Sequence, residues 1–412
     1  MIRLLSPLYP AVALCLFTLT ACGTAGKPLM GDPQDPYPLQ SPPRVGEIVH
    51  VPTGMSVSPA QMLAVAGDAR IVYVGETHDN PASHRLELQV LQGLADRYPG
   101  RAALGMEMFT RAQQPALDRW VAGELDEKAF LKESRWYENW KMDFAYYRDL
   151  LNFARERRIP VVALNAEKSL VEAVRSREAD ELGAEEKARL PELDLDDPYH
   201  RGMTMAILGD HSHGEMQPEG FVRSQTLWDE TMAESVARYL ASPAGADRHM
   251  VVVAGGNHVR YGFGIPRRTF RRLPVSYVLI GGREIDIPAN KRDRLMKIDL
   301  PRFPMAPYDF LVYLAYEDLP QTGVRLGVMT EPAPAGRGLV VRDVAAGSNA
   351  ERAGLQPGDV LIAADGEAMA KNSDLVNVVR QKRAGDRGIL EVERRGQLLK
   401  LDVLFQAAGE SR

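Results

Sequence analysis

Four side chains in the sequence could act together in one chemical site, namely Glu76, His78, Glu107 and His258. Each stands at or just beyond the end of an apolar run, where a polar group is costly unless it serves a purpose. Carboxylates and imidazoles can exchange protons with water, and imidazoles can hold a divalent metal. Taken singly, each is more readily explained as a loop residue or a hydrogen-bonded histidine. Four of them at equivalent positions indicate a shared site.

The runs that precede these residues predict the strands of one sheet. Predominantly apolar runs occupy positions 70–74, 102–108, 160–164, 249–254 and 275–280, with helical stretches between them at 83–98, 144–157 and 226–240. This alternation predicts an α/β fold, a mostly parallel sheet with helices on both faces. The carboxyl ends of parallel strands share one edge of the sheet, where ligands bind. The four side chains should therefore converge there.

Two glycines strengthen this interpretation. Gly75 stands three residues before His78, Gly255 stands three residues before His258, and Glu107 lies between the two motifs. Glycine at the end of a strand lets the backbone turn and approach a ligand closely. The paired Gly-x-x-His motifs with a glutamate resemble the ChaN and Tiki superfamily over about residues 45–285. Within that superfamily, the resemblance is to ChaN-like haem-binding lipoproteins.

The resemblance implies haem as the cofactor and a role in haem or iron uptake. Members of this type hold haem between two protomers with a tyrosine oxygen on the iron, so the resemblance also implies a homodimer. Tyr199 is the preferred iron ligand, Tyr261 is the second candidate, and His78 and His258 are expected to contact the haem. A tyrosinate suits ferric iron as a hard anionic donor. Covalent attachment is excluded, because the sequence has no Cys-x-x-Cys-His motif.

A metal-dependent hydrolase is the alternative, since other members of the superfamily, of the Tiki or erythromycin-esterase type, are hydrolases. Glu76 or Glu107 would then act as a general base, and His78 and His258 would bind a divalent metal or transfer protons. A shared scaffold can host either ligand capture or turnover, so the fold does not decide between them. A scaffold that has lost its chemistry is the third alternative, and whether the protein is an enzyme stays open.

The first 22 residues predict export with a lipid anchor. Arg3 precedes an apolar run over 4–19, and small residues then lead to Cys22, which is the pattern of a lipoprotein signal. The run is too short to span a membrane. Gly23, not aspartate, follows Cys22, which indicates a cell-envelope protein anchored by lipid in the outer membrane and facing the periplasm. Residues 23–44 are rich in glycine and proline and predict a flexible tether.

Composition and periodicity divide the rest of the chain. The net charge of −5 provides no basic field and predicts no nucleic-acid partner. The α/β domain is expected at 45–290. Prolines interrupt residues 291–320, which predicts a linker. Residues 321–406 predict a separate small domain of short strands plus two helices.

This last domain carries a distinctive motif. The segment Ala-Gly-Leu-Gln-Pro-Gly-Asp-Val-Leu, which starts at Ala353, resembles the PDZ domains of bacterial periplasmic proteins. The resemblance implies that Leu326, Gly327 and Val328 form the loop that receives the terminal carboxylate of a peptide or protein partner. A role in packing against the neighbouring domain is the alternative.

Overall fold

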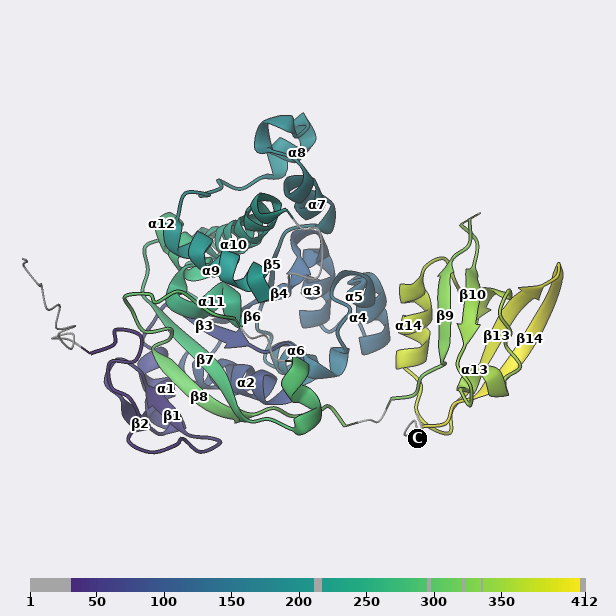
Figure 1. Cartoon of the computed structure of the whole chain (residues 1–412), viewed down its shortest axis with the longest axis horizontal. Helices are drawn as coiled ribbons and strands as arrows, with labels where there is room; N and C mark the ends of the chain where they lie inside the picture. The colour runs from purple at the N-terminus through teal and green to yellow at the C-terminus, as the bar shows by residue number, and fades with distance from the viewer. Residues whose placement is uncertain (1–30, 211–216, 295–297, 321–322, 335, 408–412) are drawn as a thin grey trace, which may run out of the picture.

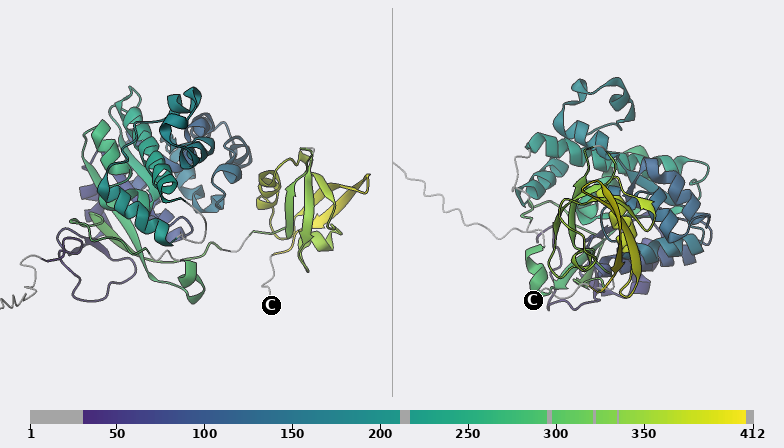
Figure 2. Two further views of the ribbon diagram at one scale, coloured as in Figure 1. Left: turned by 45° about the horizontal axis from the view of Figure 1, so that its top comes forward. Right: turned by 90° about the vertical axis from the view of Figure 1, so that its right-hand side faces the viewer.

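The structure is a computed structural model, which describes residues 31–210, 217–294, 298–320, 323–334 and 336–407. Cys22 and the predicted signal segment lie outside these residues. An α/β domain and a smaller C-terminal β domain lie side by side (Figure 1, Figure 2). Among the described residues, no helix combines the length and the apolar character needed to cross a membrane.

In the part of the chain that the structure describes, eight strands form the sheet of the α/β domain, in the order β2-β1-β8-β7-β3-β6-β4-β5. They are β1 (Ile48–His50), β2 (Met55–Val57), β3 (Ile71–Glu76), β4 (Ala102–Thr110), β5 (Val161–Asn165), β6 (His249–Gly255), β7 (Tyr277–Asp286) and β8 (Phe310–Ala315). The strands from β8 to β5 in that order run parallel, and β1 and β2 pair antiparallel at one edge. The predicted fold class is confirmed.

Helices cover both faces of this sheet (Figure 1). One face carries α1 (Pro59–Ala66), α2 (Pro81–Arg97), α3 (Gln114–Val121), α4 (Glu127–Glu133), α5 (Trp136–Asn139) and α6 (Arg148–Glu156). The other carries α7 (Lys168–Ser176), α9 (Pro198–Asp210), α10 (Pro218–Ala241), α11 (Gly256–Val259) and α12 (Ile265–Arg272), with α8 (Ala184–Arg189) further out. Short 3₁₀ turns are η1 (Arg111–Gln113), η2 (Phe144–Tyr146), η3 (Ala179–Glu181), η4 (Arg260–Gly262) and η5 (Ala289–Arg294). Because side chains alternate along a strand, Val72 and Val74 join one core while Ile71 and Tyr73 join the other.

Helix α2 begins soon after β3, at a point fixed by Asn80. The side-chain oxygen of Asn80 accepts a hydrogen bond from the N–H of Ala82 at 3.1 Å, and a proline occupies the first helical turn. The amide group of Asn80 donates to the carbonyl oxygen of Ala315 at 3.0 Å, which ties the helix start to β8. His84 and Glu87, in the first turns of α2, are buried as a result.

The structure differs from the prediction at residues 291–320, which contain strand β8 where a linker is predicted. β8 pairs with β7 and β1, and Phe310, Val312 and Leu314 are buried in the core. Pro301, Pro304 and Pro307 precede the strand, and the apolar run that follows them is only six residues long, so it gave no clear strand signal. The sheet continues to Ala315, and the connection to the next domain begins after it.

Among the described residues, the C-terminal domain has six strands, in the order β14-β13-β11-β10-β9, with β12 paired to β11. Its elements are β9 (Val328–Pro332), β10 (Leu339–Val344), α13 (Asn349–Arg352), β11 (Val360–Ala364), β12 (Glu367–Ala368), α14 (Asn372–Arg380), β13 (Arg387–Arg394) and β14 (Gln397–Leu404). Helix α14 faces the α/β domain (Figure 1), where Lys371 and Arg380 pair with Glu138 and Asp143. These ion pairs hold the C-terminal domain beside α5.

Candidate functional site

The carboxyl ends of β3, β4 and β6 form one edge of the sheet. Parallel pairing places Glu76, the last residue of β3, beside Gly255, the last residue of β6. Glu107 belongs to β4, on the other side of β6, while His78 and His258 follow β3 and β6. We call the group of Glu76, His78, Glu107 and His258 the polar edge. The structure brings these four side chains together, and their chemical roles stay predictions.

Glu107 lies between the two histidines. Its Oε2 accepts a hydrogen bond from the backbone N–H of Gly255 at 2.6 Å, and its Oε1 lies 3.6 Å from Nε2 of His258. A Cβ atom at Gly255 would lie 3.0 Å from the ring of His78 and 3.6 Å from Glu107 Oε2. Glycine therefore leaves the room that the His78 ring occupies, which explains one glycine of the paired motifs.

Helix α10 adds Asp229, a carboxylate that the sequence analysis did not select. Nδ1 of His258 donates to Oδ1 of Asp229 at 2.7 Å, and Nε2 of His200 donates to Oδ2 at 2.7 Å. Burial alone would lower the pKa of His258, but the charges of Asp229 and Glu107 outweigh it and raise this pKa to about 9. His258 is therefore cationic at neutral pH, with a carboxylate beside each ring nitrogen. The ring therefore links Asp229 of α10 to Glu107 of β4.

His78 covers Glu76. Its Nδ1 pairs with Oε1 of Glu76, and the hydroxyl of Tyr147 donates to the same oxygen at 2.8 Å. The side chain of Glu76 has no exposed surface, whereas 39% of the His78 side chain is exposed and Trp140 packs edge-on against it. Burial opposes the charged form of His78, but the hydrogen bond and charge of Glu76 raise its pKa. Because Glu76 is enclosed, the geometry does not support it as a general base towards an external substrate.

The two candidate tyrosines lie on either side of Phe263. The ring centroids of Tyr199 and Tyr261 are 5.3 and 5.5 Å from that of Phe263, each with an interplanar angle of 18°. Tyr199, on α9, is 40% exposed, while Tyr261 is buried and its hydroxyl accepts from the side chain of Gln34 at 3.4 Å. His200, the next residue of α9, is buried against Asp229. On α9, Tyr199 is thus exposed, whereas His200 bonds to Asp229, which in turn holds His258 of the polar edge.

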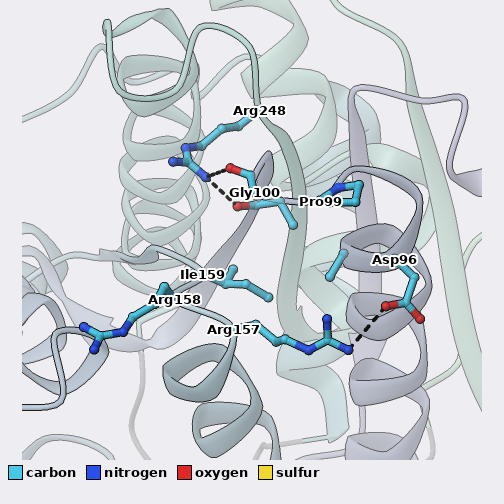
Figure 3. Close-up of a pocket in the computed structure, with 9 residues that line it drawn as sticks. Asp96, Pro99, Gly100, Arg157, Arg158, Ile159 and Arg248 are labelled. Carbon is cyan, nitrogen blue, oxygen red and sulfur yellow. Dashed lines mark hydrogen bonds and ion pairs between the residues drawn. The ribbon is translucent and has the colours of Figure 1, made fainter.

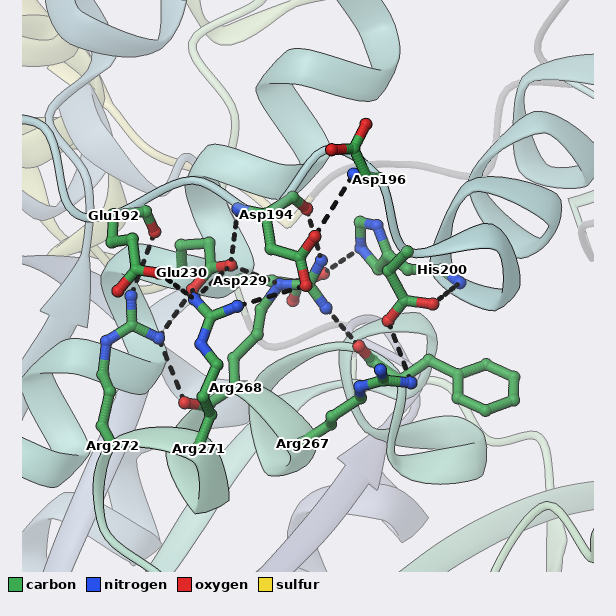
Figure 4. A network of polar contacts seen from close by, with 12 residues as sticks. Glu192, Asp194, Asp196, His200, Asp229, Glu230, Arg267, Arg268, Arg271 and Arg272 are labelled. Carbon is green, nitrogen blue, oxygen red and sulfur yellow. Dashed lines mark hydrogen bonds and ion pairs between the residues drawn. The ribbon is translucent and has the colours of Figure 1, made fainter.

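A cluster of charged side chains holds α12 against α10 beside Asp229 (Figure 4). The buried carboxylate of Glu230 lies 3.1 Å from Arg268 Nε, 3.1 Å from Arg271 Nη2 and 2.6 Å from Arg272 Nη1. Its charge is therefore compensated in the interior, where an unpaired charge would be strongly destabilising. Because Glu230 is adjacent to Asp229 in α10, this cluster also fixes the carboxylate that holds His258.

A cavity of about 160 Å³ opens at the opposite edge of the sheet, at the amino ends of β4 and β6 (Figure 3). Arg248 donates to the carbonyl oxygens of Gly100 and Ala102 at 2.9 and 3.0 Å. Arg158, on the same wall, donates to the carbonyl oxygen of Ala122 at 2.8 Å. These guanidinium groups are hydrogen-bonded to backbone carbonyl oxygens, so their role in the wall of the cavity is structural. The cavity is separate from the polar edge.

The predicted carboxylate-binding loop of the C-terminal domain leads into β9. Leu326 is buried in the core, Gly327 has a φ of +83°, and Val328 begins the strand. A Cβ atom at Gly327 would lie 2.3 Å from Cβ of Ser348, so this position needs glycine. β9 is an edge strand and lies beside α14. An extended peptide can add to such an edge.

The residues that sequence reasoning missed are helical: His200 and Asp229, and the buried pair His84 and Glu87. Their helices were expected only to cover the sheet. A usable signal exists in α2, because Glu87 precedes the buried Leu91 by four residues and therefore shares its face. An ionisable residue on the apolar face of a helix indicates a buried polar cluster.

Two family models match this chain. A family model for "Haem-binding uptake, Tiki superfamily, ChaN" matches residues 62–269, and a PDZ domain model matches residues 321–404. Both resemblances seen in the sequence are thereby confirmed. A probable periplasmic DegP-like serine endoprotease of Hahella chejuensis is 37% identical over 67 residues, which is 16% of this chain and 14% of that protein. The chain thus spans only a small part of this curated relative.

Two solved structures are also similar. One, described as cofacial haem binding to ChaN of Campylobacter jejuni, is 14% identical, covers 64% of this chain and 95% of that chain, and has a TM-score of 0.49. The other, the HtrA-type protease AlgW with a decapeptide, is 26% identical, covers 21% of this chain and 30% of that chain, and has a TM-score of 0.20.

Proposed function

Because the chain belongs to the haem-binding ChaN family of the Tiki superfamily, we propose that its α/β domain binds haem on the outward face of α9, with Tyr199 as the iron ligand. The observation that carries this proposal is the exposure of Tyr199, which an external ligand can reach, in contrast to Tyr261. Its phenolate is a hard anionic donor that suits ferric iron. Haem supplies the iron and a flat, largely apolar ring.

The outward face of α9 fits such a ring. Tyr199, Gly202, Met205 and Gly209 recur at intervals of three and four residues and so share one face of the helix. Tyr199 and Met205 are exposed, and a Cβ atom at Gly209 would meet nothing within 4 Å. Gly202 lies against Pro301 and Phe303, where a Cβ atom would be 3.8 and 4.0 Å away, so these two residues border the surface on which a flat group could lie, with the tyrosine at one end.

Other residues of the chain have supporting roles in this proposal. Arg201 of α9 and Arg267 of α12 have 41% and 54% of their side chains exposed and pair with Glu219 and Asp197. They could exchange these partners for the propionate groups of the haem. His258 has carboxylates beside both ring nitrogens, and it supports α9 through Asp229 and His200 instead of binding iron. His78, with its exposed ring, remains a candidate contact for the haem edge.

The test is a titration of the full-length protein, purified in detergent, with ferric haem. Wild-type protein should shift the Soret band at one haem per chain. Tyr199→Phe should weaken binding at least about tenfold, because even the loss of an outer-shell partner of a metal ligand costs roughly that much. Tyr261→Phe should bind like wild type and serves as the matched control. A wild-type protein that gives no Soret shift discards the function, and equal binding by Tyr199→Phe discards only the ligand.

The cellular role follows from the same proposal. Anchoring at Cys22 in the outer membrane would keep the haem site in the periplasm as part of haem or iron uptake. The PDZ domain would recruit the C-terminus of a protein partner along β9, next to the loop of Leu326, Gly327 and Val328. A homodimer would enclose the haem between two outward faces of α9, and gel filtration with and without haem measures this association.

A further inference from the structure

Three ionisable side chains form a buried cluster between the end of β3 and the first turns of α2, next to the polar edge. Glu76, His84 and Glu87 each offer a ligand atom, and these atoms lie within 4.8 Å of one another. Nδ1 of His84 lies 3.2 Å from Oε2 of Glu76 and 3.1 Å from Oε2 of Glu87. The two carboxylate side chains have no exposed surface, and that of His84 is 4% exposed.

Two oxygens of the cluster lack a hydrogen-bond partner among the described residues: Oε2 of Glu76 and Oε1 of Glu87. Buried carboxylates normally have a partner, because burying an unpaired charge or an unsatisfied polar atom is strongly unfavourable. One imidazole between two carboxylates does not satisfy both. The cluster therefore needs either a proton shared by the carboxylates or a bound cation, and burial beside Glu76 raises the pKa of Glu87 in the absence of an ion.

The hydrogen bonding of His84 shows which ring nitrogen faces the carboxylates. Its Nε2 lies 3.0 Å from the backbone carbonyl oxygen of His78. A carbonyl oxygen only accepts, so Nε2 carries a proton, and Nδ1 is the ring nitrogen that faces Glu76 and Glu87. Once Nδ1 has lost its own proton to a bound cation, its lone pair points at the space between these carboxylates. Histidines that bind metals usually donate their other N–H to a carbonyl or carboxylate in this way.

We propose that Glu76, His84 and Glu87 bind one divalent first-row metal ion of the Mn²⁺, Fe²⁺ or Zn²⁺ class. Two carboxylates and a neutral imidazole balance its double positive charge, which leaves the buried cluster neutral. Mixed oxygen and nitrogen donors favour these ions over Ca²⁺ and Mg²⁺, which prefer oxygen alone. The hydroxyl of Tyr147, 2.8 Å from Oε1 of Glu76, orients that carboxylate.

The cluster is distinct from both sites considered above. It shares Glu76 with the polar edge, but its other two ligands come from the first turns of α2 and not from the paired Gly-x-x-His motifs. The proposed haem ligand, Tyr199, lies on α9, which covers the other face of the sheet. Without an ion, two protons would have to supply the same charge, one on His84 and one shared by the carboxylates.

Metal analysis of the haem-free, full-length protein separates these states. The protein is stripped with a chelator, reloaded with Mn²⁺ or Zn²⁺ and assayed by equilibrium dialysis with mass-spectrometric metal analysis. Wild-type protein should bind one ion per chain. Glu87→Gln preserves the size of the side chain but removes its charge and should weaken binding by more than about 100-fold. Glu284→Gln changes a glutamate that accepts from Asn80 outside the cluster, and it should bind like wild type.

Spectroscopy of the wild-type protein keeps the test independent of how the variants fold. Pulsed electron paramagnetic resonance of bound Mn²⁺ should detect a single imidazole ligand. A signal from two imidazole ligands would place the ion at His78 and His258 and overturn the proposal. No ion bound by the wild type, or full binding by correctly folded Glu87→Gln, would overturn it as well. The outcome does not depend on haem binding, because the protein is tested without haem.

Discussion

Replacement of Asp229 by asparagine tests whether this carboxylate controls the charge of His258. Asp229 is 2% exposed and accepts from His258 and His200, each at 2.7 Å. Asparagine keeps the shape of the side chain but removes its charge, and one of its two terminal atoms becomes a donor. We expect the pKa of His258 to fall from about 9 to its ordinary value of 6.5 or below.

The magnitude follows from these two values. The difference between about 9 and 6.5 corresponds to about 3 kcal/mol, at roughly 1.36 kcal/mol per pKa unit. This figure is a net value, in which burial opposes the combined effect of Asp229 and of Glu107, 3.6 Å away. Because the folded-state pKa of His258 is raised, its contribution to stability is fully present below about pH 6.5 and is lost as the pH rises through about 9. Asp229→Asn should therefore lose much less stability than wild type as the pH rises from neutral to alkaline.

Two measurements check this expectation. NMR titration of the histidine ring protons gives the pKa of His258, and denaturant unfolding from neutral to alkaline pH gives the loss of stability. Glu234→Gln is the matched control, because Glu234 lies on the same helix and pairs with Arg111 and Arg238 instead. A His258 titration that is the same in wild type and in Asp229→Asn would refute the reasoning.

Three further expectations concern other parts of the chain. Gly327→Ala should destabilise the PDZ domain by about 1–3 kcal/mol in thermal unfolding, because of its positive φ, whereas Gly323→Ala, where a Cβ atom meets nothing within 4 Å, should be close to neutral. Glu138→Lys should loosen the contact between the domains and increase the radius of gyration in X-ray scattering, and adding Lys371→Glu should reverse the change; no increase would contradict the role of this pair. Cys22→Ser should abolish labelling with palmitate, and label that persists would remove the lipid anchor.

The central strands could be predicted from the sequence because of how they are buried. β4 and β6 are covered on both faces, so they appear as continuous apolar runs, and polar residues mark their ends. The same reasoning placed Glu107 and His258 at one edge. It failed for β8, a six-residue strand that follows closely spaced prolines, and for the three-residue β1.

The partners of the polar edge could not be predicted, since they depend on tertiary packing. Asp229 and His258 are 29 residues apart and belong to different helices, so no motif connects them. Glu87 lies in α2, whose leucines predict only that the helix packs against the sheet. Composition also could not rank the fourteen tyrosines, whereas exposure separates Tyr199 from Tyr261.

The strand order has a consequence for folding. β3 and β4 are successive in the chain, but β6 lies between them in the sheet, and residues 111–248 separate β4 from β6. Until β6 is available, the facing edges of β3 and β4 have no partner in this sheet, and unpaired strand edges promote association with other chains. Closing so long a loop also slows folding. Because Glu107 bonds to Gly255 and Asp229 bonds to His258, the polar edge can assemble only when β6 inserts, and a chain that ends before residue 249 should aggregate.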